Sequence, residues 1–142
     1  MLRRDACEEA NPGCGSDEIR DILKAQWLSE TDQAPFLLLE DVGERPYRLD
    51  RMWAHLALAG VFDQVRGLAL GSFTGCEEAG ADYGSAEVLR ELAAGTGLPC
   101  IAELPVGHGP LNLAVPLGAP VRLDADAGQL HFLAPVVEAR GG

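Results

Sequence analysis

The sequence has few cysteines, few basic residues and no long apolar run. Four cysteines occur in 142 residues, without a Cys-x-x-Cys pair and without a histidine at zinc-ligand spacing, so neither a zinc site nor a disulfide framework is expected. The chain has 11 Lys and Arg residues and 22 Asp and Glu residues, which gives a formal net charge of −11. Because an acidic surface repels nucleic acid and anionic membranes, the composition predicts neither as a partner.

Several short motifs are also absent. The first residues, MLRRDACEEANPG, contain two arginines but lack the apolar core of a secretory signal, so a cytoplasmic location is expected. No apolar stretch approaches the roughly 20 residues that a bilayer span needs. The chain contains no phosphate loop, no H-E-x-x-H motif and no dinucleotide-binding fingerprint. We therefore expect no cofactor and no metal.

What is present fits one globular domain. The chain is 47% hydrophobic and 23% charged, which is ordinary for a folded domain of this length. Residues 1–15 are polar and aperiodic and are predicted to form an irregular lead-in, and 16–142 to form the domain. Apolar spacing predicts helices at 16–27, 49–59 and 85–92, and strands at 35–39, 65–73, 99–104, 120–124 and 129–134.

Local signals support these elements. Pro46 suits the first turn of the second helix, Gly60 its end, and Ser85 the N-cap of the third. The second helix is expected to bury Met52 and Trp53, together with Leu56 and Leu58. Strands that alternate with helices and end in a hairpin predict an α/β fold: a mixed sheet, helices packed on it and a C-terminal β-hairpin.

Two places bear side chains suited to catalysis. Glu40 and Asp41 follow a buried strand, where α/β folds place ligand-binding groups, although acids are also common where strands meet solvent. His108 lies between Gly107 and Gly109, which leave its imidazole uncovered. The alternative is a turn histidine satisfied by the backbone. A carboxylate that orients an imidazole forms a general-base pair, so these residues are candidates for one.

Other polar residues have supporting or structural interpretations. Asn112 is a candidate to hold the histidine loop through hydrogen bonds from the backbone. Glu44, near the second helix, is a candidate for a supporting role or for an ion pair with a neighbouring arginine. His55 and His131 are interpreted as surface or half-buried residues. Ser16 precedes acids at a helix start, which favours an N-cap over a nucleophile.

Two segments of the chain are distinctive: LLLEDVGERPYRLDRMWAHLALAGVFDQVRGLALGSFTGC and LPVGHGPLNLAVPLGAPVRLDA. They resemble the C-terminal domain of the LD-carboxypeptidases, a family that includes murein tetrapeptide carboxypeptidases and microcin C self-immunity hydrolases. The resemblance covers roughly residues 35–133. It rests on two specific patterns, L-E-D-x-x-E-x-P-Y-R-x-D-R-M and P-x-G-H-G-x-x-N-x-x-x-P-L-G.

The resemblance implies a fold and an activity. The family's C-terminal domain is a swivelling β/β/α module, and its enzymes use a Ser–Glu–His triad without metal. Glu40 matches the family's glutamate and His108 its general base. Members act in the cytoplasm on muropeptides in peptidoglycan recycling, where they remove the terminal D-alanine across an L,D bond, usually as homodimers.

The sequence departs from the family at the nucleophile. In the family the serine and the oxyanion hole lie in a separate N-terminal α/β domain, about a hundred residues before the glutamate. Gly15-Ser16-Asp17 only faintly resembles the family's nucleophile motif, because no apolar strand precedes it. The chain alone is therefore expected to be inactive. The alternatives are a truncated or split homologue that assembles with a nucleophile-bearing partner, and a fragment of a longer coding sequence.

Overall fold

The computed structural model describes residues 34–134. Within them the elements in chain order are β1 (Phe36–Val42), α3 (Pro46–Leu58), the short 3-10 helix η1 (Phe62–Gln64), β2 (Gly67–Thr74), α4 (Ser85–Thr96), β3 (Cys100–Ile101), β4 (Val121–Asp124) and β5 (Gln129–Phe132). The predicted lead-in at 1–15 and the predicted helix at 16–27 lie outside the described residues.

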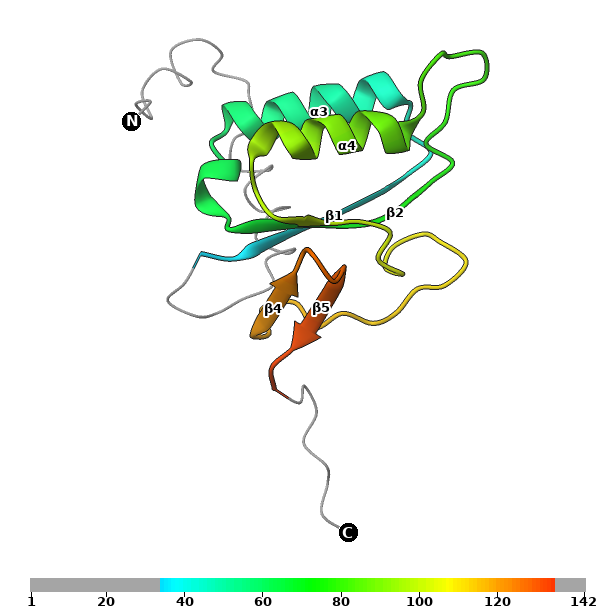
Figure 1. Ribbon diagram of the computed structural model, residues 1–142. Helices are drawn as coiled ribbons and strands as arrows, with labels where there is room; N and C mark the ends of the chain where they lie inside the picture. The colour runs from blue at the N-terminus through cyan, green and yellow to red at the C-terminus, as the bar shows by residue number, and fades with distance from the viewer. Residues whose placement is uncertain (1–33, 135–142) are drawn as a thin grey trace.

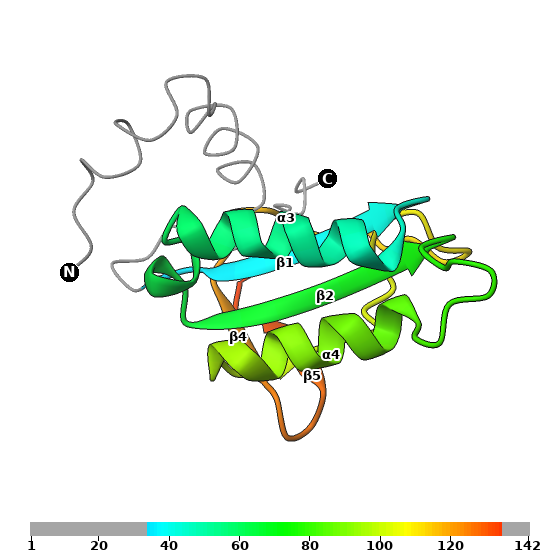
Figure 2. The same ribbon diagram turned by 90° about the horizontal axis from the view of Figure 1, so that it is seen from above.

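These elements form three layers (Figure 1). Strands β1, β2 and β3 make a parallel sheet in that order, and β4 pairs with β5 in an antiparallel hairpin. Parallel neighbours need a crossover connection, and α3 and α4 supply the two crossovers. Both helices lie side by side on one face of the sheet, and the hairpin lies on the other (Figures 1 and 2). The predicted α/β fold with a C-terminal hairpin is confirmed.

Each face of the parallel sheet buries its own core. Leu37 and Leu68 are fully covered on the helix side, where they pack with Trp53 of α3 and Leu89 of α4. The larger set on this side also includes Leu49, Val61, Val65, Leu70, Cys76 and Ala93. Side chains alternate along a strand, so the intervening residues face the hairpin. Phe36, Leu38, Ala69 and Ile101 form that second core with Val121.

The helices differ from the prediction in their ends and exposed faces. Helix α3 begins at Pro46, as the proline signal indicated, three residues before the range that apolar spacing gave; proline is pre-organised for the first helical position. Met52 and Leu58, predicted to be buried, are 39% and 79% exposed, because they lie on the solvent side of α3. Ser85 is not the N-cap of α4; Gly84 takes that position. The carboxylate of Glu77 instead accepts hydrogen bonds from Ser85 N and Oγ.

The strands also differ from the prediction. Strand β1 runs to Val42, three residues beyond its predicted end, so Glu40 and Asp41 lie within the strand and not after it. The hairpin forms a sheet of its own, so the described strands make two sheets instead of one mixed sheet. The third strand was predicted over 99–104, but only Cys100–Ile101 forms a regular ladder. Glu103 adopts a left-handed conformation with φ of 60°, which interrupts the strand. Pairing to β2 then resumes, because Leu104 N donates to Leu70 O.

Candidate functional site

Glu40 lies near the carboxyl end of β1. On this strand Phe36 and Leu38 face the hairpin, so alternation places the Glu40 side chain on the same side. The cores of the two faces fix β1 in register, because a one-residue slip would exchange its buried and exposed side chains. The strand therefore holds the carboxylate on the side of the sheet from which the segment after β3 approaches.

The loop that carries His108 is attached to the edge of β2. Leu104 N donates to Leu70 O, and Val106 O accepts from Ser72 N at 2.8 Å and from Ser72 Oγ at 3.0 Å. Within the loop, Leu113 N donates to Pro105 O and Gly107 N donates to Asn112 Oδ1 at 3.1 Å. The predicted role of Asn112 in holding this loop is supported by that contact.

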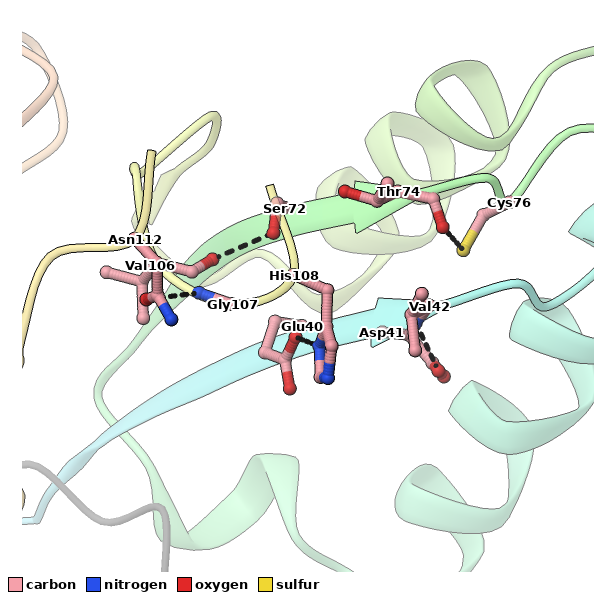
Figure 3. A network of polar contacts seen from close by, with 10 residues as sticks. All are labelled: Glu40, Asp41, Val42, Ser72, Thr74, Cys76, Val106, Gly107, His108 and Asn112. Carbon is pink, nitrogen blue, oxygen red and sulfur yellow. Dashed lines mark hydrogen bonds and ion pairs between the residues drawn. The ribbon is translucent and has the colours of Figure 1, made fainter. Parts of the chain in front are cut away.

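The loop brings His108 to Glu40. Nδ1 of His108 lies 2.8 Å from Oε2 of Glu40 (Figure 3). The Glu40 side chain is 23% exposed and that of His108 is 59% exposed. A carboxylate accepts hydrogen bonds, so the short contact favours a proton on Nδ1 and leaves Nε2 as the acceptor when the ring is neutral. The arrangement is that of an oriented base whose second nitrogen can take a proton.

The other candidates do not join this pair. Asp41 Oδ1 accepts from Val42 N, and Glu44 forms an ion pair with Arg48 at 3.0 Å. Neither makes a hydrogen bond or ion pair with Glu40 or His108. The ion-pair interpretation of Glu44 is confirmed. His55 is exposed on α3 and His131 is half-buried on β5, as the sequence indicated.

Sequence reasoning missed Ser72, which lies with Gly71 on β2, opposite Glu40 and against the segment that leads to His108. Leu39 pairs with Leu70 and Asp41 with Phe73, so Glu40 alone opposes both Gly71 and Ser72. This is a β-bulge on β2. One signal was available: Leu68, Leu70 and Phe73 share the helix side, so the apolar alternation of β2 shifts by one residue after Leu70.

No nucleophile for the pair occurs within the described part of the chain. Between residues 34 and 134, no serine, threonine or cysteine side chain makes a hydrogen bond to His108, and Ser72 Oγ is committed to Val106 O. Ser16 lies outside the described residues. Burial raises the pKa of the Cys100 thiol and, as the largest of several effects, that of the Cys76 thiol, which keeps both in the unreactive protonated form.

Metal and membrane features were sought in the same range. Among residues 34–134, no group of three or more His, Cys, Asp and Glu side chains is placed to hold a metal ion. None of the helices described there is long and apolar enough to cross a bilayer.

Comparison with known proteins identifies the family. Residues 13–123 match the model of the LD-carboxypeptidase C-terminal domain. The chain belongs to the LD-carboxypeptidase family. It is 42% identical over 114 residues to a putative carboxypeptidase of Synechocystis sp. The aligned region covers 78% of this chain and 37% of that protein. It is also 37% identical over 90 residues to the murein tetrapeptide carboxypeptidase of Pseudomonas aeruginosa, covering 63% of this chain and 29% of that protein.

Solved structures agree with this LD-carboxypeptidase assignment. A muramoyltetrapeptide carboxypeptidase from Oxalobacter formigenes superimposes with a TM-score of 0.61 at 28% identity, covering 69% of this chain and 35% of that one. The microcin C7 self-immunity protein MccF, in complex with aspartyl sulfamoyl adenosine, gives the same TM-score at 27% identity, covering 72% and 31%. The chain thus spans about a third of the length of the relatives it matches.

Proposed function

We propose that this domain supplies the glutamate and the histidine of a Ser–Glu–His triad that cleaves the terminal D-amino acid from L,D-muropeptides. The single observation that carries the proposal is the 2.8 Å contact between His108 Nδ1 and Glu40 Oε2. The exposure of the His108 side chain leaves Nε2 accessible to an incoming hydroxyl. Two relatives that are named as muropeptide carboxypeptidases support the substrate class.

The two residues have distinct roles in this mechanism. Nε2 of His108 takes the proton of the serine hydroxyl as Oγ attacks the peptide carbonyl, and then passes it to the departing amine of the D-amino acid. Glu40 fixes the tautomer and stabilises the imidazolium that forms between these steps. Water then hydrolyses the acyl-enzyme, with His108 again acting first as base and then as acid. In each half of the reaction His108 accepts one proton and releases one, so the ring returns to its neutral form.

The serine comes, in this proposal, from a polypeptide segment beyond the 142 residues, either in the same protein or in a partner chain. The surface around His108 supports this. From Leu104 to Pro120 the chain carries no acidic or basic residue except His108. Leu111, Leu113 and Leu117 are 58%, 52% and 50% exposed on the same segment. Exposed apolar side chains on an uncharged segment are typical of an interaction site, here for the nucleophile-bearing segment.

A chimera tests the proposal directly. The part of the Synechocystis relative that this chain matches is replaced by this chain, and release of D-alanine from an L,D-tetrapeptide is measured. We expect activity, a loss of about 10⁴-fold or more in His108→Ala and a loss of about 10²- to 10⁴-fold in Glu40→Ala. His55→Ala, on the exposed face of α3, is the matched control. A folded but inactive chimera, or equal activity in His55→Ala and His108→Ala, would contradict the proposal.

A second candidate is a catalytically inactive module that only assembles with a nucleophile-bearing partner. The same exposed leucines favour it. In that case the purified domain binds its partner through this surface, and His108→Ala leaves D-alanine release by the assembly unchanged. The homodimeric state and the cytoplasmic role in peptidoglycan recycling, both expected from the family, remain proposals alongside it.

A further inference from the structure

The bulge in β2 has geometric consequences on both sides of the strand. On the β1 side, Gly71 and Ser72 lie opposite Glu40. On the other side, both lie against the segment that leads to His108, through Val106 O. Figure 3 shows Ser72 on β2 with Val106, and the loop passing on to His108 above Glu40. The bulge therefore lies against both the strand that carries Glu40 and the segment that leads to His108.

Gly71 is needed because the backbone of the loop approaches it closely. A Cβ at this position would lie 2.6 Å from Val106 O and 3.1 Å from the Cβ of Glu40. The first of these is a backbone atom, so a side chain at Gly71 cannot be accommodated by rotating a neighbour. Alanine here would push the His108 loop away from the sheet, and Glu40 away from its present place.

Ser72 is needed because the bulge turns its side chain toward the loop. In a regular strand, alternation would place residue 72 on the helix side with Leu68 and Leu70. The bulge moves Phe73 to that side instead, and Ser72 Oγ reaches Val106 O at 3.0 Å. Its side chain also lies against both glycines of the loop: a Cβ on Gly107 would lie 2.7 Å from Ser72 Oγ, and one on Gly109 would lie 3.2 Å from Ser72 Cβ.

We infer that Gly71 and Ser72 are positioning residues, which set the height of the His108 loop above β2 so that Nδ1 faces Glu40. The catalytic meaning of this inference rests on the proposed function, but the positioning itself does not. Neither residue touches substrate in the proposed mechanism. They act through Val106 and the two glycines, by fixing the backbone from which the imidazole projects.

The test reads the tautomer of His108 in the purified chain by ¹⁵N NMR, which distinguishes Nδ1–H from Nε2–H in the neutral ring. Glu40→Ala gives the ratio of Nδ1–H to Nε2–H without the carboxylate. We expect Gly71→Ala to give that same ratio. We expect Ser72→Ala to lower the ratio about fivefold, which is the change in an equilibrium constant that the loss of one neutral hydrogen bond produces.

Two matched controls separate positioning from general destabilisation. Gly95 lies in α4 with open space around its Cβ position, so Gly95→Ala is expected to leave the tautomer ratio unchanged. Thr96 Oγ1 donates to Ala93 O at 2.7 Å and accepts from Leu98 N, so Thr96→Ala loses a comparable half-buried bond far from the pair. It should lower the melting temperature and leave the tautomer unchanged.

The outcomes are distinct from those of the chimera experiment. A Ser72→Ala ratio equal to that of the unsubstituted chain, or a shift of the same size in Thr96→Ala, would overturn the inference. If Gly71→Ala does not fold, Ser72→Ala decides by itself. An inactive chimera together with a tautomer that follows Gly71 and Ser72 would defeat the proposed function and leave the positioning intact.

Discussion

Gly107 lies so close to Glu40 that a Cβ on it would overlap Oε2 of the carboxylate. The same Cβ would lie 2.7 Å from Ser72 Oγ, and the backbone φ of 107° is one that side chains rarely adopt. The glycine before the histidine therefore provides the space in which the Glu40–His108 contact forms. The sequence pattern Gly-His-Gly indicated an uncovered imidazole; the structure shows that the first glycine also accommodates the carboxylate.

Gly107→Ala should cost more stability than its backbone conformation alone explains. Gly128, in the hairpin turn, also has positive φ, at 64°, but nothing lies near its Cβ position. Gly128→Ala should therefore show the conformational strain of the left-handed region, about 1 kcal/mol. Gly107→Ala adds to this the strain of a φ beyond that region and the steric overlap, at least about 1 kcal/mol more. Urea denaturation of both variants measures the difference. Equal losses would show that the loop has room for a side chain beside Glu40.

The sequence was sufficient to predict the elements that bury apolar surface. Continuous apolar runs and helical spacing located β1, β2, α3 and α4, and the short Asp-Ala-Gly turn located the hairpin. The candidate pair could also be identified, because Glu40 comes directly after an apolar run and His108 lies between two glycines. A resemblance to a known family supplied the roles.

What could not be predicted depends on contacts between distant segments. The left-handed Glu103 and the bulge at Gly71 and Ser72 interrupt patterns that read as continuous strands. The burial of Met52 was overestimated because α3 has only one face against the sheet, and spacing alone did not fix its rotation. Glu77 takes over a capping role that local sequence assigned to Ser85, eight residues later.

Glu77→Ala should destabilise the domain more than Glu78→Ala. The carboxylate of Glu77 accepts from Ser85 N at 3.3 Å and from Ser85 Oγ at 2.7 Å, and Ser85 is buried at the start of α4. Loss of such a helix cap costs about 1 kcal/mol. Glu78 pairs only with the exposed Arg45, so Glu78→Ala should cost less than about 0.5 kcal/mol. Chemical denaturation distinguishes them; a larger effect at Glu78 would refute the capping assignment.

Leu68→Ala should be among the most destabilising single changes in the described core. The side chain projects from β2 toward the helices and is fully buried, so its truncation leaves a cavity and should cost about 2 to 5 kcal/mol. Leu58 is 79% exposed on α3, and Leu58→Ala should change stability by less than about 0.5 kcal/mol. The midpoints of thermal unfolding give the comparison. Similar midpoints would mean that the helices do not cover β2 in solution.

The two described cysteines should make the domain less stable in alkaline solution. Burial raises the pKa of both thiols above the ordinary 9.0, and at Cys76 the carboxylate of Asp41 adds to the rise while backbone N–H groups of Glu44 and Gly43 oppose it. The folded state therefore holds these protons more tightly than the unfolded state. Their contribution to stability is fully present below pH 9.0 and is lost as the pH rises through the folded-state pKa.

The measurement is the free energy of unfolding as a function of pH, from neutral to alkaline, in the unsubstituted chain and in a Cys76→Ala, Cys100→Ala double variant. At neutral pH the double variant has a lower free energy of unfolding, because it loses buried volume. Its stability should nevertheless fall less steeply with pH, because two thiols no longer titrate. All other ionisable groups are common to both proteins, so the difference between the two slopes isolates Cys76 and Cys100. Parallel curves would show that the thiols ionise as readily in the folded state as in the unfolded chain, and that neither is shielded as the structure indicates.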